Sequence, residues 1–123
     1  MLASGTFSVK LTPQDDDRFP AGRMLIRKTY AGELTANATG QMISKRTDSG
    51  PAVYYALEEV AGSLAGKKGC FTLLHKGYMD QNGQVLDVSI LQGSGTGDFQ
   101  GISGSMVIEQ IEEGHEYRLT YEL

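Results

Sequence analysis

The sequence lacks most of the features that mark disulfide-rich, membrane-spanning or nucleic-acid-binding proteins. Its single cysteine, Cys70, cannot form an internal disulfide, which is compatible with a reducing cytoplasm. No apolar run approaches the roughly 20 residues that cross a bilayer, and the first residues lack the basic and apolar regions of a signal peptide. The 11 basic and 15 acidic residues give a net charge of −4 without the clustered positive charge that nucleic acids require. We therefore expect a soluble, cytoplasmic protein that binds neither nucleic acid nor membrane.

Tryptophan is absent and proline is scarce, whereas glycine is frequent. The chain has 3 prolines and 16 glycines, and apolar segments persist between the glycines. This distribution is typical of many turns and bulges rather than of disorder. A length of 123 residues suits one folded unit. The sequence therefore predicts a single domain over residues 1–123.

Alternation of apolar and polar residues dominates the chain and predicts β-strands. Segment 53–64 admits either a helix or a strand, but its Val-Tyr-Tyr start and its glycines favour a strand. Asn82-Gly83 indicates a tight hairpin. Eight short-linked strands would pair antiparallel and could close to remove their edges. We therefore expect an all-β fold, a closed antiparallel barrel of roughly eight strands, over segments 7–11, 24–30, 34–45, 53–64, 69–78, 85–91, 102–111 and 115–123.

The hairpin near residue 66 places a carboxylate beside an imidazole. With a turn centred on Gly66-Lys67, Glu58 would face His75 on an otherwise apolar inner surface. A carboxylate orients the imidazole tautomer and would let His75 act as a general acid or base. The alternative is a buried, hydrogen-bonded pair that only holds the strands in register.

The last hairpin adds further polar groups to the same surface. A turn centred on Glu113-Gly114 would pair Gln110 with Tyr117 and Met106 with Tyr121. On the outer face, the same register predicts an exposed ion pair between Glu109 and Arg118, which would contribute little stability. An apolar interior with a few polar groups is typical of a small-ligand site, and equally of a filled barrel core.

Three other motifs have simpler interpretations. The glycine-rich segment 93–98 lacks the lysine and the helix of a phosphate loop, so a hairpin or bulge explains it better. The acidic triplet 15–17 lacks the spacing of a calcium loop and reads as a solvated loop. Two histidines and one cysteine, far apart in sequence, do not form a zinc motif. We predict no metal site and no cofactor.

Several segments together resemble a bacterial family called domain of unknown function 3224. They are Gly5-Thr6-Phe7 and segments 54–62, 69–77, 93–104 and 115–123. The resemblance implies a fold similar to the barrel of allene oxide cyclase, whose wider group binds hydrophobic small molecules and often forms homo-oligomers. It implies no activity, and the cyclase's own catalytic segments have no match in this chain. The recurrent positions of the family, which have no assigned roles, include Glu58, His75, Ser94, Thr96, His115 and Tyr117.

Three functions remain open from the sequence. The first is a barrel that binds a small apolar molecule. The second is an isomerase or cyclase in which Glu58 and His75 move protons. The third is a structural homo-oligomer with a filled barrel, joined through outward apolar residues such as Val107 and Ile111. For the first, the candidate ligand-binding residues are Gln110, Tyr117, Tyr121, Met106, Ser94, Thr96 and His115.

Overall fold

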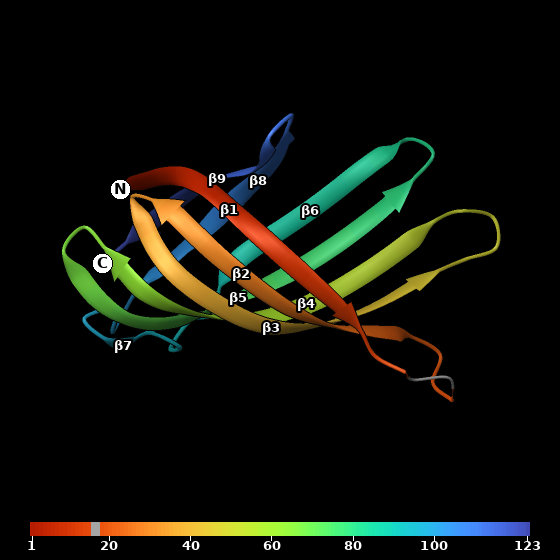
Figure 1. The fold of residues 1–123 in the computed structure, drawn as a ribbon, viewed down its shortest axis with the longest axis horizontal. Coiled ribbons are helices and arrows are strands. Elements are labelled where there is room, and N and C mark those ends of the chain that lie inside the picture. Colours follow the sequence, from red (N-terminus) through yellow and green to blue (C-terminus); the bar gives the residue numbers. More distant parts are fainter. Residues whose placement is uncertain (16–17) are drawn as a thin grey trace.

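A computed structural model of the chain, which describes residues 1–15 and 18–123, is an antiparallel β-barrel closed by eight long strands (Figure 1). Each strand pairs with its neighbour in the order β4-β3-β2-β1-β9-β8-β6-β5, and β5 pairs back onto β4. The predicted all-β barrel is confirmed, and segment 53–64 lies within a strand. The strands are β1 (Leu2–Pro13), β2 (Gly22–Gly32), β3 (Leu34–Arg46), β4 (Ala52–Leu64), β5 (Lys67–Asp80), β6 (Gly83–Ile90), the two-residue β7 (Thr96–Gly97), β8 (Ser103–Ile111) and β9 (Gly114–Glu122).

The predicted register of the β4–β5 hairpin is wrong by two residues. Its turn is centred on Ala65-Gly66, with φ angles of 53° and 79°, so Glu58 faces Leu73 rather than His75. Positive φ at both central residues is the geometry of a tight hairpin turn, but an alanine is rare there and gave no signal in the sequence. A shift of two residues preserves which face each side chain occupies. Both predicted residues therefore still point into the barrel.

The β8–β9 hairpin carries the same error. Gln110 faces His115 and Gly104 faces Tyr121, in place of the predicted pairs with Tyr117 and Met106. The predicted outer ion pair does form, diagonally across the strands, with 2.9 Å between Arg118 Nη2 and Glu109 Oε1.

One end of the barrel is packed solid. The loop that contains β7 folds over this end, and Phe99 and Ile102 enter the core from it. Phe99 meets Phe71 edge to face, with 5.6 Å between ring centroids. Segment 93–98 is thus part of a plug that closes this end. Gly93 and Gly97 adopt positive φ angles of 87° and 64°, which glycine tolerates without steric cost. The fully buried residues of this half include Tyr30, Leu34, Val60, Leu64, Leu73, Tyr117 and Leu119.

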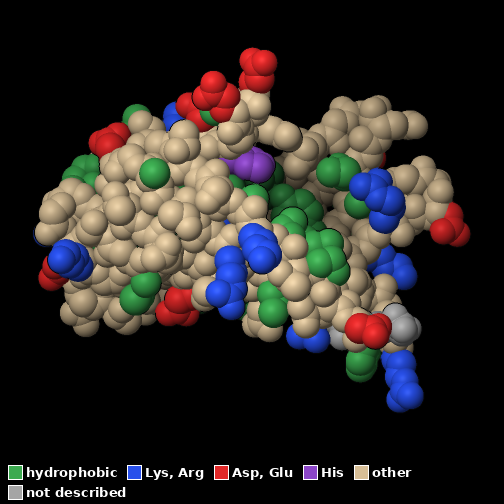
Figure 2. Space-filling model, in the orientation of Figure 1, with side chains coloured by type: hydrophobic (Ala, Val, Ile, Leu, Met, Phe, Trp, Pro, Cys, Tyr) green, Lys and Arg blue, Asp and Glu red, His purple; other side chains and the backbone are tan. Residues whose placement is uncertain are grey.

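The other end of the barrel is open. Strands β6 and β8 pair at only two positions, Val88–Met106 and Ser89–Ser105, and β9 follows β1 only as far as Phe7. Beyond these points the strands diverge, as the splayed right-hand end in Figure 1 shows. Figure 2 shows a hollow at this position, in which hydrophobic side chains and a histidine gather. The barrel is therefore a cup with a packed base. No helix in the described part of the chain is long and apolar enough to span a membrane.

Candidate functional site

The cup encloses a cavity of 630 Å³ with apolar walls. This volume falls within the roughly 300–1,000 Å³ of small-molecule sites. The lining residues come from all eight long strands, and polar groups lie at the rim and at the floor. The apolar lining includes Phe7, Val9, Leu11, Ile26, Met42, Ala56, Leu86 and Ile108. The polar lining consists of Lys28, His75, Gln84, Glu109, Gln110 and His115.

Small residues on β3 make room for long polar side chains at the floor. Three successive inward positions of this strand are Ala36, Ala38 and Gly40, and Gly40 lies directly opposite Glu58. A Cβ at Gly40 would lie 2.4 Å from the carbonyl oxygen of Leu57, so no larger residue fits without movement of the backbone. The space left by these three residues is adjacent to the strands that carry Lys28 and Glu58.

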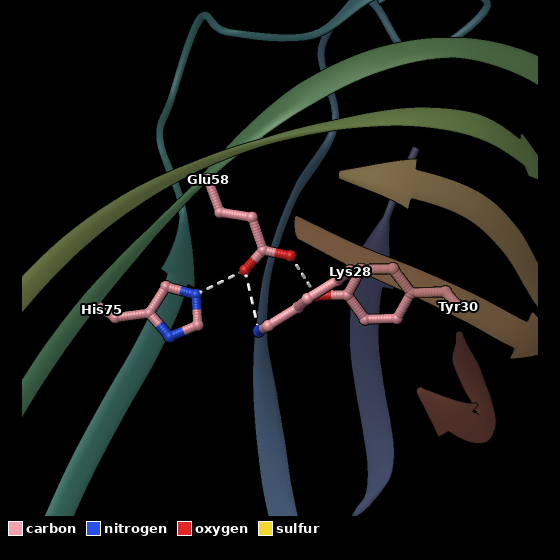
Figure 3. A network of polar contacts seen from close by, with 4 residues as sticks. All are labelled: Lys28, Tyr30, Glu58 and His75. Atoms are coloured by element: carbon pink, nitrogen blue, oxygen red, sulfur yellow. Dashed lines mark hydrogen bonds and ion pairs between the residues drawn. The ribbon is translucent and has the colours of Figure 1, made fainter. Parts of the chain in front are cut away.

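Three side chains donate hydrogen bonds to one buried carboxylate at the floor (Figure 3). Glu58 on β4 is 0% exposed, and its Oε2 lies 2.7 Å from Nε2 of His75 and 3.0 Å from Nζ of Lys28. Its other oxygen, Oε1, accepts a hydrogen bond from the hydroxyl of Tyr30. Strands β2, β4 and β5 thus bring together residues as far as 47 positions apart in sequence (75 − 28 = 47).

The charges of the network follow from its contacts. Burial alone would raise the pKa of Glu58, but the His75 hydrogen bond, the Lys28 charge and the Tyr30 hydrogen bond together lower it below its ordinary value. Burial and the neighbouring Glu58 carboxylate raise the pKa of Tyr30, so this phenol stays protonated. Because Glu58 is ionised and can only accept, Nε2 of His75 must carry a proton toward it.

The floor presents nitrogen atoms rather than the carboxylate to the cavity. Lys28 and His75 border the cavity, whereas Glu58 lies beneath them. Nδ1 of His75 points away from Glu58 (Figure 3), and no described group bonds it. Nζ of Lys28 also lies over the ring of Phe7, 4.6 Å from its centroid, in a cation–π contact. A molecule in the cup would meet an ammonium group and a free imidazole nitrogen at its base.

The structure brings only some of the predicted site residues to this cavity. His75, Gln110 and His115 border it, Glu58 supports its floor, and His115 stacks on Phe7 with centroids 4.9 Å apart. The remaining predicted residues lie elsewhere. Met106 and Tyr121 are buried in the packed half, and Thr96 is exposed on the outer side, where it pairs with Cys70.

Tyr117 and Ser94 have partners in the backbone. The hydroxyl of Tyr117 accepts a bond from the Leu34 amide at 2.9 Å and lies 3.1 Å from the carbonyl oxygens of Ala31 and Leu34. This side chain therefore secures the β2–β3 turn. Ser94 Oγ accepts from the amide of Thr72 at 3.0 Å and donates to a loop carbonyl at 2.6 Å, which anchors the plug.

Sequence reasoning missed Lys28 and Tyr30. A signal for them existed, because Met24, Ile26, Lys28 and Tyr30 share the inward parity of one strand, and a lysine in an apolar series is unusual. Their contact with Glu58 depends on the pairing of β3 with both β2 and β4, which the sequence alone does not predict.

The acidic triplet, the metal-binding residue types and Cys70 lie as follows in the structure. Asp15 is exposed, while Asp16 and Asp17, the rest of the acidic triplet, lie outside the described residues. Over residues 1–15 and 18–123, no three His, Cys, Asp or Glu side chains are grouped so that they could hold a metal ion. Cys70 is on the outer face of β5, partly buried, and pairs with Thr96 of β7.

Comparison with known proteins gives a family. The model of a protein family of unknown function, DUF3224, matches residues 3–121. The chain belongs to the DUF3224 family. A crystal structure of a DUF3224 protein of unknown function from Shewanella oneidensis MR-1 is 35% identical and superposes with a TM-score of 0.93, covering 100% of this chain and 96% of that one. No curated protein matches the chain. The similarity to that DUF3224 structure supports the barrel fold.

Proposed function

We propose that the cup binds a small molecule with an apolar body and a hydrogen-bond acceptor at one end. The observation that carries this proposal is the contrast between the walls and the floor. The walls are mainly aliphatic and aromatic, and the floor offers Lys28 and His75 while it hides Glu58. Burying an apolar surface favours binding, and a few fixed polar groups orient the ligand.

The floor favours a ligand with an acceptor group because Lys28 has free N–H donors and the Glu58 carboxylate is already occupied. Both oxygens of Glu58 receive hydrogen bonds from the protein. Lys28 has three N–H donors, and one of them is used by Glu58. A carbonyl, carboxylate or sulfonate oxygen could accept one of the others, whereas a second cation would be repelled by Lys28.

Calorimetric titration with 1-anilinonaphthalene-8-sulfonate tests the proposal, because this probe has apolar rings and an acceptor group. We expect saturable binding to the wild-type protein. Leu86→Trp fills part of the cavity and should weaken binding about tenfold, which corresponds to about 1.4 kcal/mol. The matched control is Val85→Trp on the same strand, where the side chain is 66% exposed and points outward.

Two results would contradict the binding proposal. One is the absence of saturable binding, and the other is an equal loss of affinity in Leu86→Trp and Val85→Trp. A native mass spectrum of the purified protein adds an independent check, because a tightly held natural ligand would appear as extra mass on each chain.

Val107, named from sequence as a contact residue, is 50% exposed on the outer face of β8, and Ile111 is partly exposed on the same face. We propose a cytoplasmic homo-oligomer of barrels similar to allene oxide cyclase. Sedimentation velocity tests the assembly: wild type should sediment as a multimer and Val107→Asp as a smaller species, and a monomeric wild type would exclude it.

A further inference from the structure

His75 is held in the arrangement of a general base. The ionised Glu58 fixes the proton on Nε2, so the lone pair of the neutral ring lies on Nδ1, on the far side from the carboxylate. If Nδ1 takes up a proton, the resulting imidazolium remains 2.7 Å from Glu58, which stabilises its charge. Such a group can remove a proton from a molecule in the cup and return it.

Lys28 neighbours His75 at the floor, where it can stabilise a negative oxygen of a molecule in the cup. Its Nζ and Nε2 of His75 bond the same atom, Oε2 of Glu58, at 3.0 and 2.7 Å, so both side chains converge on one point at the floor. Only 7% of the Lys28 side chain is exposed, and low exposure strengthens its interaction with a developing negative charge.

We propose that the floor of the cup catalyses the enolisation of an apolar ketone or aldehyde. Nδ1 of His75 removes a proton from the carbon next to the carbonyl. The electron pair of the broken C–H bond forms the C=C bond, and the carbonyl π pair moves to the oxygen, which accepts an N–H of Lys28. The imidazolium then returns a proton to the same carbon or, in an unsaturated ketone, to a carbon farther along. No oxidant, reductant or cofactor enters the balance. Glu58 is a positioning residue in this step.

This activity rests on the proposed function, because the ketone must first occupy the cup. The activity can be measured without knowing the natural substrate. In D₂O, the proton on the imidazolium exchanges with solvent, so each enolisation cycle replaces an α-hydrogen of the ketone by deuterium. Proton NMR of 2-octanone in D₂O follows this exchange, and calorimetric titration measures the binding of the same ketone.

The expected result is exchange faster than in buffer containing an equal concentration of imidazole, with preference for one of the two hydrogens at carbon 3. His75→Gln can keep a hydrogen bond to Glu58 but has no base, so the rate should fall about 10²-fold or more while ketone affinity is kept. Lys28→Gln should slow the exchange as well. Lys76→Gln is the matched control, since this neighbouring side chain is exposed and points outward.

Glu58→Gln tests the positioning role by splitting two constants. The catalytic rate constant should fall, because the amide stabilises the imidazolium less than a carboxylate does, while the apparent Michaelis constant for 2-octanone should hardly change. Circular dichroism and thermal melting establish that each variant is folded under the assay conditions.

The outcomes separate the two proposals. Binding of 2-octanone without exchange above the imidazole blank overturns the enolisation step and leaves the binding function intact. Exchange that survives in His75→Gln also overturns it, because another group would then move the proton. A protein that binds neither 2-octanone nor 1-anilinonaphthalene-8-sulfonate overturns both.

Discussion

Replacing the polar network at the floor with apolar side chains tests whether this network serves ligand binding or the stability of the fold. Lys28→Met alone removes one of the three donors to Glu58, whose carboxylate is 0% exposed and cannot recover the loss from water. Breaking one partner of a buried ion pair costs about 3–5 kcal/mol. The whole domain should have about 5–15 kcal/mol of stability, so this single change removes a large share.

The complete replacement should behave differently. A variant with Lys28→Met, Tyr30→Phe, Glu58→Met and His75→Leu leaves no buried charge or hydroxyl without a partner at the floor. Exchanging a buried ionic network for apolar residues of similar volume is often neutral or stabilising, by about 1–4 kcal/mol. We therefore expect the fourfold variant to regain at least the stability of wild type while it loses the acceptor-dependent part of ligand binding.

Equilibrium unfolding in urea measures both effects. With a slope of about 2 kcal/mol per molar urea, a loss of 4 kcal/mol moves the midpoint down by about 2 M. A fourfold variant no more stable than Lys28→Met would refute the reasoning, because the network would then be needed for the fold itself. A Lys28→Met cost below about 1 kcal/mol would also refute it, since Glu58 would not need its cation.

Three further predictions follow from individual contacts. Tyr117→Phe should cost about 1–3 kcal/mol, because the Leu34 amide loses its partner, and should leave probe binding unchanged by calorimetry. The pKa of Glu58 is lowered in the folded state, so its ionisation stabilises the fold above the ordinary carboxyl pKa of 4.5, and this stabilisation is lost as the pH falls through the folded-state pKa. The urea midpoints of wild type and Glu58→Gln should therefore differ most near neutral pH and converge as the pH falls below about 4.5. A difference that stays constant with pH would exclude this linkage. Gly40→Ala should lower the thermal midpoint, because its Cβ would meet the Leu57 carbonyl at 2.4 Å; an unchanged midpoint would show that the strand can move aside.

The register of the hairpins shows where reading the sequence fails. The turn at Ala65-Gly66 contains an alanine with a φ of 53°, a conformation that few alanines adopt, so the sequence pointed one position too late. The same offset occurred before Gly114, which begins β9 rather than ending the turn. Both errors shift the pairing by an even number of residues, and the inward or outward direction of each side chain therefore survived.

The alternating pattern by itself determined the all-β class, the strands and the face on which Glu58 and His75 lie, because burial of one face of a strand imposes a period of two. The plug role of segment 93–102 and the contact of Lys28 and Tyr30 with Glu58 were decided by the tertiary structure. Strands β2 and β4 do not pair with each other and meet only across β3, whose Ala38 and Gly40 leave the space between them. Closure of the barrel also placed the apolar walls around that charge network. The limited pairing of β6 with β8 leaves one end of the barrel open. These contacts depend on how all the strands close around one interior, and the local alternation of apolar and polar residues does not predict that arrangement.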